Sequence, residues 1–143
     1  MSDGTVIIIG GAEDKVRDRV ILSRFVSLAG GSDATIAVIS TASSLGAEAG
    51  QRYRDVFGDL GVKRVRTLHA MTRPQANDES AAQALRDASG VFLTGGNQLR
   101  LSSTIGGTRL ADAILERFRQ AAVGAGTSAG ASAMSSHMIA FGA

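Results

Sequence analysis

The sequence has no cysteine, no tryptophan, one tyrosine, one proline and two histidines among its 143 residues. The absence of cysteine excludes disulfide bonds, thiolate metal sites and a cysteine nucleophile. Because His69 and His137 are the only histidines, we do not expect a histidine-rich metal cluster. No apolar run approaches the length of a membrane span, and the first residues lack the basic leader and long apolar core of a secretory signal. We therefore expect a cytoplasmic protein that does not enter a membrane.

No sign of charge dominates the chain, since 15 basic residues face 13 acidic ones and the net charge is +2. The basic residues are spread along the sequence and mixed with acids, whereas nucleic-acid surfaces cluster them and add aromatic side chains for stacking. We expect no nucleic-acid partner. Apolar residues make up 44% of the chain and charged residues 20%, which is typical of one globular domain with a real core.

Apolar runs rich in β-branched residues alternate with segments of helical periodicity along the whole chain. The predicted strands are Thr5–Ile9, Ala34–Ser40, Val62–Leu68, Val91–Thr94 and Ala121–Gly126. Helices are expected at Lys15–Ala29, around Tyr53–Leu60, Ala81–Ala88 and Leu110–Phe118, and again from Ala129, whereas Thr72–Ser80 reads as a loop. The third strand is the most polar and is expected nearer an edge.

This order predicts an α/β fold, doubly wound, with a mainly parallel sheet and helices on both faces. In such sheets ligands bind at the carboxyl ends of the strands. Four of the five predicted strand ends are rich in glycine, hydroxyl or amide side chains, and a site is expected there. We also expect the fifth strand to leave one flank of the sheet without a neighbour, so that Val123–Gly126 would need a covering element from elsewhere.

The sharpest motif is Gly-Thr-Ser-Ala-Gly at 126–130, a G-x-S-x-G pattern at a predicted strand-to-helix junction. The tight turn lifts a serine hydroxyl clear of the sheet, and glycines two residues before and after it relieve the crowding. Ser128 is therefore the candidate nucleophile. The backbone N–H of Ala129, at a helix N-terminus, is a candidate oxyanion donor.

Two other interpretations use the same residues. Residues 124–129 also fit G-x-G-x-x-A, a dinucleotide fingerprint, although the acidic residue expected about 20 positions later is missing. A tight connection built from small residues for close packing is the third interpretation.

A glycine pair follows the fourth strand, in Gly95-Gly96-Asn97-Gln98. The Gly96 N–H is a candidate second oxyanion donor, and Gln98 is a candidate substrate contact. The alternative is a plain helix start with Asn97 as its cap.

Three segments together resemble cyanophycinases, serine peptidases related to dipeptidase E: GGAEDK at 10–15, TGGNQLRL at 94–101 and GTSAGASAMS at 126–135. The resemblance covers the whole chain and implies a fold akin to class I glutamine amidotransferases, flavodoxin-like in its sheet. It implies a serine exo-isopeptidase that degrades cyanophycin (multi-L-arginyl-poly-L-aspartate) to β-Asp-Arg dipeptides. On that template Ser128 is the nucleophile, Gly96 and Ala129 form the oxyanion hole, Gln98 contacts substrate, no metal or cofactor is needed, and homodimers are expected.

In that family the base histidine and its acidic partner follow the nucleophile helix, beyond the last residue here. His137 would lie on the opposite side of a continuing helix from Ser128, and His69 is expected to be a half-exposed loop residue. We therefore expect residues 1–143 to be a single α/β domain that is incomplete as an enzyme, with the base on a complementary C-terminal half. An aspartyl dipeptidase and a catalytically silent fragment or binding module remain the alternative functions.

Overall fold

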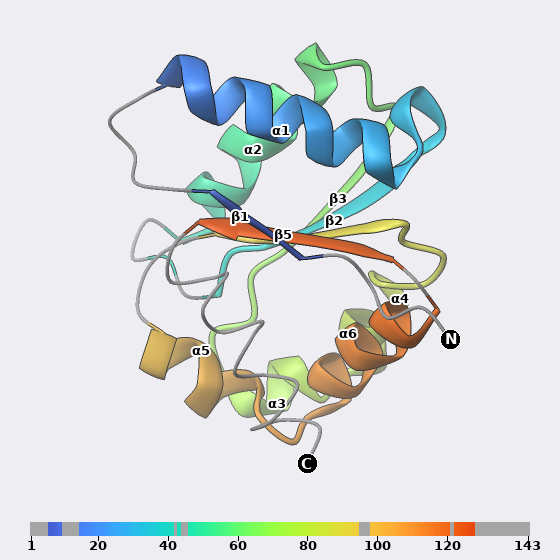
Figure 1. The fold of residues 1–143 in the computed structure, drawn as a ribbon. Coiled ribbons are helices and arrows are strands. Elements are labelled where there is room, and N and C mark those ends of the chain that lie inside the picture. The colour runs from blue at the N-terminus through green and yellow to red at the C-terminus, as the bar shows by residue number, and fades with distance from the viewer. Residues whose placement is uncertain are drawn as a thin grey trace.

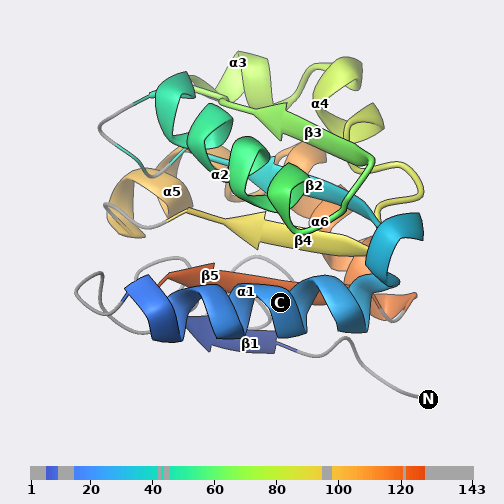
Figure 2. The same cartoon turned by 90° about the horizontal axis from the view of Figure 1, so that it is seen from above.

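The computed structural model describes residues 6–9, 15–41, 43, 46–94, 98–120 and 122–127. Five strands form one sheet in the order β1-β5-β4-β2-β3, and every pair is parallel. The strands are β1 (Val6–Ile9), β2 (Thr35–Ile39), β3 (Arg64–Leu68), β4 (Gly90–Leu93) and β5 (Val123–Thr127). Figure 2 shows this order from above. The predicted parallel α/β sheet is confirmed, and β3 does lie at an edge.

Helices cover both faces of the sheet, as expected for a doubly wound fold (Figure 1). One face carries α1 (Lys15–Ala29) and α2 (Ala47–Asp59). The other face carries α3 (Arg73–Ala76), α4 (Glu79–Gln83), α5 (Gln98–Ile105) and α6 (Arg109–Arg119). A short 3₁₀ turn, η1 (Gly31–Asp33), joins α1 to β2.

The strands β2 to β5 reproduce the flavodoxin-like order 2-1-3-4, and β1 extends the sheet beyond β5. The expectation that the fifth strand would leave a flank open is therefore wrong. Gly124 of β5 pairs with Val6 on one side and with Val91 on the other. The neighbour on the open flank is β1, the first strand of the sequence. Sequence reasoning did not predict this pairing, because the order of strands in a sheet depends on how the connections cross the sheet and not on their order along the chain.

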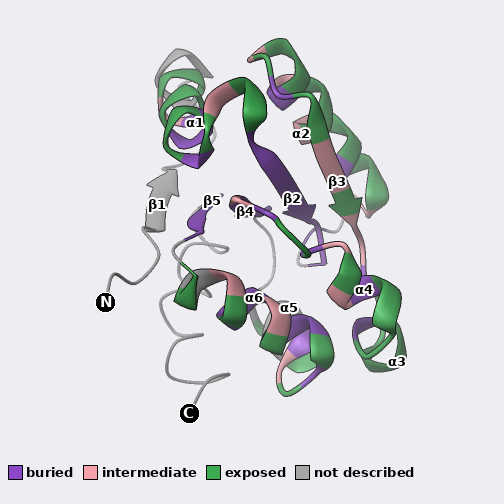
Figure 3. Cartoon of the chain, turned by 90° about the vertical axis from the view of Figure 1, so that its right-hand side faces the viewer, coloured by how far each residue is buried: buried purple, intermediate pink, exposed green. Residues whose placement is uncertain are grey.

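Two apolar cores follow from the alternation of side chains along the strands. Ile36 and Val38 of β2 face α1 and α2, whereas Ala37 and Ile39 face the helices of the opposite layer. All five residues of β2, an inner strand of the sheet, are buried (Figure 3). A strand that is buried on both faces must be apolar throughout, which explains its continuous apolar sequence.

The segment 72–80, expected to be a loop, is instead a pair of capped turns of helix. The Thr72 hydroxyl accepts a hydrogen bond from the Gln75 N–H at 3.3 Å, and the Asp78 carboxylate accepts one from the Ser80 N–H at 3.1 Å. These caps start α3 and α4. The segment is also tied to the helix layer, because the Asn77 side chain accepts a hydrogen bond from the backbone N–H of Arg109 at 3.0 Å.

The helix limits also differ from those expected in three places. Helix α2 begins at Ala47, six residues before the first large apolar residue of its periodic stretch. The helix expected through Ala88 ends at Gln83, and Asp87 then has a φ of 61°. Helix α5 begins at Gln98, where a helix start was only the alternative interpretation of residues 95–98. The helix expected from Ala129 lies outside the described residues.

Candidate functional site

The carboxyl ends of β4 and β5 lie side by side, and these are the strands that lead to the predicted catalytic segments. Leu93 of β4 is in register with Gly126 of β5. The β5 strand ends at Thr127, the residue before Ser128. Gly96, Ser128 and Ala129 lie outside the described residues, so the oxyanion hole remains a prediction.

The fourth predicted site residue, Gln98, is the first residue of α5, and its side chain is not among those described. Its role as a substrate contact therefore also remains a prediction. The chain reaches this helix start only four positions after Thr94, so α5 begins close to the carboxyl end of β4.

The dinucleotide interpretation of residues 124–129 is wrong. That fingerprint places its glycines in the turn after a strand. Here Gly124 and Gly126 are strand residues, paired with Val91 and Leu93 of β4 and flanked on the other side by β1. Their backbone is used by the sheet ladder and does not form a phosphate-binding turn.

His69 directly follows β3 and is half-buried at the same edge of the sheet. Its Nδ1 lies 3.0 Å from the carbonyl oxygen of Ser40 and 2.9 Å from the Ser40 hydroxyl. A carbonyl oxygen only accepts, so Nδ1 is the donor in this contact. The ring thereby fastens the end of β3 to the end of β2.

His69 is poorly placed to serve as a base for a nucleophile after β5. Two strands, β2 and β4, separate β3 from β5. At a spacing of about 4.8 Å between neighbouring strands, the ends of β3 and β5 are roughly 14 Å apart. A general base must come within about 3 Å of the proton that it accepts.

Hydroxyl groups gather where β2 and β4 end. Ser40, Thr41 and Thr94 are 1–2% exposed, and Ser43 is also buried. The backbone N–H of Thr94 donates to the Ile39 carbonyl at 3.0 Å, which continues the ladder between the two strands by one residue. The hydroxyls therefore lie at the level where the sheet gives way to its loops.

Two of these hydroxyls are buried without a hydrogen-bond partner. Of all the buried side-chain nitrogen and oxygen atoms in the described part of the chain, only Thr41 Oγ1 and Thr94 Oγ1 lack a hydrogen-bond partner. A buried polar group without a partner costs about 1–3 kcal/mol. Sequence reasoning noted the run of hydroxyl residues after β2, but burial without a partner arises only from tertiary packing.

The direction in which successive strands are added to the sheet reverses between β2 and β4. After β2 the chain passes to α2 on one face, and after β4 it passes to α5 on the other (Figure 1). In open α/β sheets the crevice at such a reversal is where ligands bind. The two unsatisfied hydroxyls belong to residues at the strand ends where the strand order reverses.

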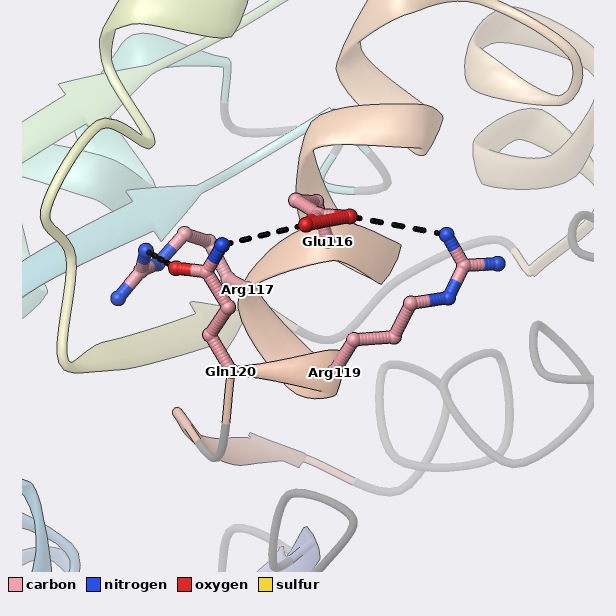
Figure 4. Close-up of polar contacts among 4 residues, drawn as sticks. All are labelled: Glu116, Arg117, Arg119 and Gln120. Atoms are coloured by element: carbon pink, nitrogen blue, oxygen red, sulfur yellow. Dashed lines mark hydrogen bonds and ion pairs between the residues drawn. The ribbon is translucent and has the colours of Figure 1, made fainter. Parts of the chain in front are cut away.

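A hollow of about 490 Å³ lies away from this edge, on the surface of α4 and α6. It is lined by Ala82, Arg109, Asp112, Ala113, Leu115, Glu116 and Arg119. Beside it a network of charged and amide side chains fixes the end of α6 (Figure 4). Glu116 accepts from Gln120 at 3.1 Å and pairs with Arg119 at 3.7 Å.

This network is structural. The Arg117 guanidinium donates to the Ala88 carbonyl at 2.8 Å and to Gln120 at 2.7 Å. Ala88 lies two residues before β4, so the network anchors α6 at the amino edge of the sheet, opposite the strand ends that lead to the predicted site. The hollow on α4 and α6 is not the candidate active site.

The described residues contain no group of three or more histidine, aspartate or glutamate side chains able to hold a metal ion. In the same part of the chain, no helix is long and apolar enough to cross a membrane.

Comparison with known proteins points to one family. A cyanophycinase from Geminocystis herdmanii is 42% identical over 139 residues, which are 96% of this chain and 51% of that protein. A cyanophycinase from Trichormus variabilis is 44% identical over 138 residues, 96% of this chain and 46% of that protein. The chain thus spans about half the length of these curated relatives.

The fold has a counterpart among solved structures. The crystal structure of a peptidase from an acI-B1 Actinobacterium superposes with a TM-score of 0.72 at 18% identity, covering 90% of this chain and 55% of that one. The family model of Peptidase family S51 matches residues 6–142. The match extends over nearly the whole sequence, and the chain therefore belongs to peptidase family S51.

Proposed function

We propose that this chain is the nucleophile-bearing part of a serine-type peptidase that hydrolyses cyanophycin to β-Asp-Arg dipeptides. The observation that carries the proposal is the identity of 42–44% with cyanophycinases across 96% of the chain. The sheet supports it, because the segments that hold Gly96 and Ser128 follow two adjacent strands in register, β4 and β5.

The product defines which bond is broken. Each repeating unit of the polymer carries arginine on the side-chain carboxyl of a main-chain aspartate. A β-Asp-Arg product keeps that side-chain bond, so the bond hydrolysed is the main-chain amide between successive aspartates. The proposed activity therefore hydrolyses main-chain amides and leaves the isopeptide bond to arginine intact in the product.

In the proposed mechanism the Ser128 hydroxyl attacks the carbonyl carbon of that amide. The N–H groups of Gly96 and Ala129 stabilise the oxyanion, and a base accepts the serine proton and passes it to the leaving amine. Water then hydrolyses the acyl-enzyme and restores the serine. Since His69 is held against Ser40 at the far side of the sheet, we assign the base to a complementary C-terminal part of the protein.

The test is turnover of purified cyanophycin by the complete protein, with the released dipeptide identified by mass spectrometry. Ser128→Ala should reduce kcat by a factor on the order of 10⁶ and leave the circular dichroism spectrum unchanged. Ser132→Ala is the matched control, a serine four residues further on that should retain most of the activity. Near-normal turnover by Ser128→Ala would exclude the serine mechanism.

The same assay separates the alternatives. Release of dipeptides from short aspartyl peptides but not from the polymer would identify an aspartyl dipeptidase. No hydrolysis of either substrate by the complete protein would favour a catalytically silent binding module. The cytoplasmic location and the homodimer remain predictions, to be checked by cell fractionation and by mass measurement in solution.

A further inference from the structure

A groove runs along the surface of α4 and α6, in the helix layer on the opposite side of the sheet from α1 and α2 (Figure 1). It consists of two neighbouring hollows of about 490 and 230 Å³, which share Ala82, Ala113 and Glu116 as lining residues. The larger hollow follows α6 from Arg109 to Arg119. At a rise of about 1.5 Å per helical residue this stretch is roughly 15 Å long, enough for about four residues of an extended polypeptide.

Exposed charges of both signs line the groove in equal number. The arginines are Arg86, Arg109 and Arg119, and the acids are Asp87, Asp112 and Glu116. One further lining arginine, Arg117, is half-buried, and its guanidinium is already bound to the Ala88 carbonyl and to Gln120. The six exposed side chains thus carry no net charge, and they offer both cations and anions to a ligand.

The apolar part of the lining is small. It consists of Ala82, Leu85, Ala113 and Leu115, and both leucines are buried. Interfaces between folded proteins have an apolar core that is depleted of charged residues. The groove has the opposite composition, with charges along its whole length, so it suits a charged ligand better than a second copy of the chain.

The two acids of α6 have a spacing that an extended polymer can match. Asp112 and Glu116 are four residues apart, so they share one face of the helix and lie about 6 Å apart along its axis. In an extended polypeptide every second side chain is on the same side, at intervals of about 7 Å. Glu116 is bound only by Gln120 and by the exposed Arg119 (Figure 4). Exposed ion pairs contribute little to stability, so a cation of the ligand can replace Arg119 at small cost.

Cyanophycin carries complementary groups on every repeat. Arginine is joined to each backbone aspartate through its amino group, so the guanidinium is a cation and the free α-carboxylate is an anion. The polymer is therefore a zwitterion without net charge, like the groove. Guanidinium groups and carboxylates pair through two parallel hydrogen bonds, whichever partner belongs to the protein.

We propose that the groove between α4 and α6 is an exosite, a site that binds cyanophycin chains outside the catalytic centre. This inference rests on the proposed function for the identity of the ligand, and on the charge pattern of the groove for its location. Asp112 and Glu116 bind the guanidinium groups of two repeats on the same side of the polymer, and Arg109 and Arg119 bind α-carboxylates. The exosite keeps a polymeric substrate close to the protein between successive hydrolysis steps.

The first test measures binding of the complete protein to immobilised cyanophycin, with Ser128→Ala present to prevent hydrolysis. Asp112→Asn with Glu116→Gln should weaken this binding about tenfold. Arg109→Gln with Arg119→Gln should weaken it to a similar degree, because the ligand uses charges of both signs. Unchanged binding in both double variants would overturn the proposal.

Asp55→Asn with Asp59→Asn is the matched control. These acids are also exposed and four residues apart, but they lie on α2, on the opposite face of the sheet. The control removes the same charge and should leave binding to cyanophycin unchanged. An equal loss of binding in the control would mean that net charge sets the affinity, and the groove would lose its role.

Kinetics separate the exosite from the catalytic centre. With Ser128 intact, the groove variants should raise KM for cyanophycin about tenfold and leave kcat unchanged. A trimer of β-Asp-Arg units is too short to occupy both sites, so its KM should not change. Equal rises in KM for polymer and trimer would refute the exosite, because the variants would then act on the catalytic centre. A lower mass in solution for the groove variants would also refute it, because the groove would then be an interface between copies.

Failure of the exosite and failure of the proposed function give different results. Turnover of cyanophycin with no change of binding or KM in the groove variants would overturn the exosite alone. Binding that depends on the groove, without turnover by the wild type, would support the exosite and refute the peptidase. Neither binding nor turnover by the wild type would refute both.

Discussion

Replacement of Phe92 by alanine should be among the most destabilising single changes in the described part of the chain. Phe92 is fully buried in β4 and contacts three other aromatic rings. Its ring centroid lies 4.5 Å from that of Tyr53, 5.5 Å from Phe57 and 6.1 Å from Phe25. These four rings are two thirds of the six aromatic side chains in the whole sequence.

The size of the effect follows from burial and from ring contacts. Truncation of a buried phenylalanine to alanine costs about 3–5 kcal/mol through lost burial and the cavity left behind. Three aromatic pairs add about 0.5–1.5 kcal/mol each to what burial alone provides. The upper half of the first range is therefore expected, and it is a large share of the ~5–15 kcal/mol that stabilises a domain.

The measurement is urea unfolding of the complete protein followed by circular dichroism. Phe92→Leu keeps most of the apolar volume and loses the ring contacts, so it should fall between wild type and Phe92→Ala. Met71→Ala is the control, because Met71 is 70% exposed and its loss should change the stability by less than about 0.5 kcal/mol. A cost below about 1.5 kcal/mol for Phe92→Ala would refute the view that this cluster joins α1 and α2 to the sheet.

Two further changes test close packing and the α6 network. Gly90→Ala should destabilise by about 1–3 kcal/mol in the same unfolding assay, because a Cβ there would lie 2.9 Å from an α1 phenylalanine ring and 3.1 Å from an α1 methyl group. Gly50→Ala, whose Cβ would meet nothing closer than 3.5 Å, should be tolerated, and equal effects would contradict the packing argument. Arg117→Met should cost about 1–2 kcal/mol by removing the donor to the Ala88 carbonyl. Arg119→Met should cost less than about 0.5 kcal/mol, since its ion pair is exposed, and a larger loss there than at Arg117 would refute the anchoring role.

The strands were predictable because their sequences carry the signal directly. β2 is buried on both faces of the sheet. Its continuous run of alanine, isoleucine and valine is typical of such a strand. Helix α1 was predicted with the same limits that the structure gives, since Gly30 and Gly31 end it with positive φ angles.

The short helices were missed because their signals are caps rather than periodicity. α3 has four residues and α4 has five, too few for an apolar stripe to repeat. Thr72 and Asp78 were the available signals, and in a segment with a proline they also fit a turn. The shortness of α3 and α4 therefore explains why they were not predicted as helices.

For the candidate site, sequence reasoning located the edge but not the state of its groups. It placed glycine and hydroxyl residues at the carboxyl ends of the strands, and β4 and β5 do end side by side. It did not show that Thr41 and Thr94 are buried without partners, because neighbours in the fold decide this. Nor did it show that β1 pairs with β5, which depends on how the crossovers pass over the sheet.

The pairing of β1 with β5 also determines when the sheet can be completed. Val6 meets Gly124, so β1 pairs with a strand that lies more than 100 residues further along the chain. Contacts of such sequence separation slow folding, because a long loop must close before they form. During synthesis β2, β3 and β4 are available to pair while β1 still has no partner. The apolar residues Val6–Ile9 thus leave the ribosome well before their place in the sheet exists, and chaperone binding at this segment would protect the nascent chain from aggregation.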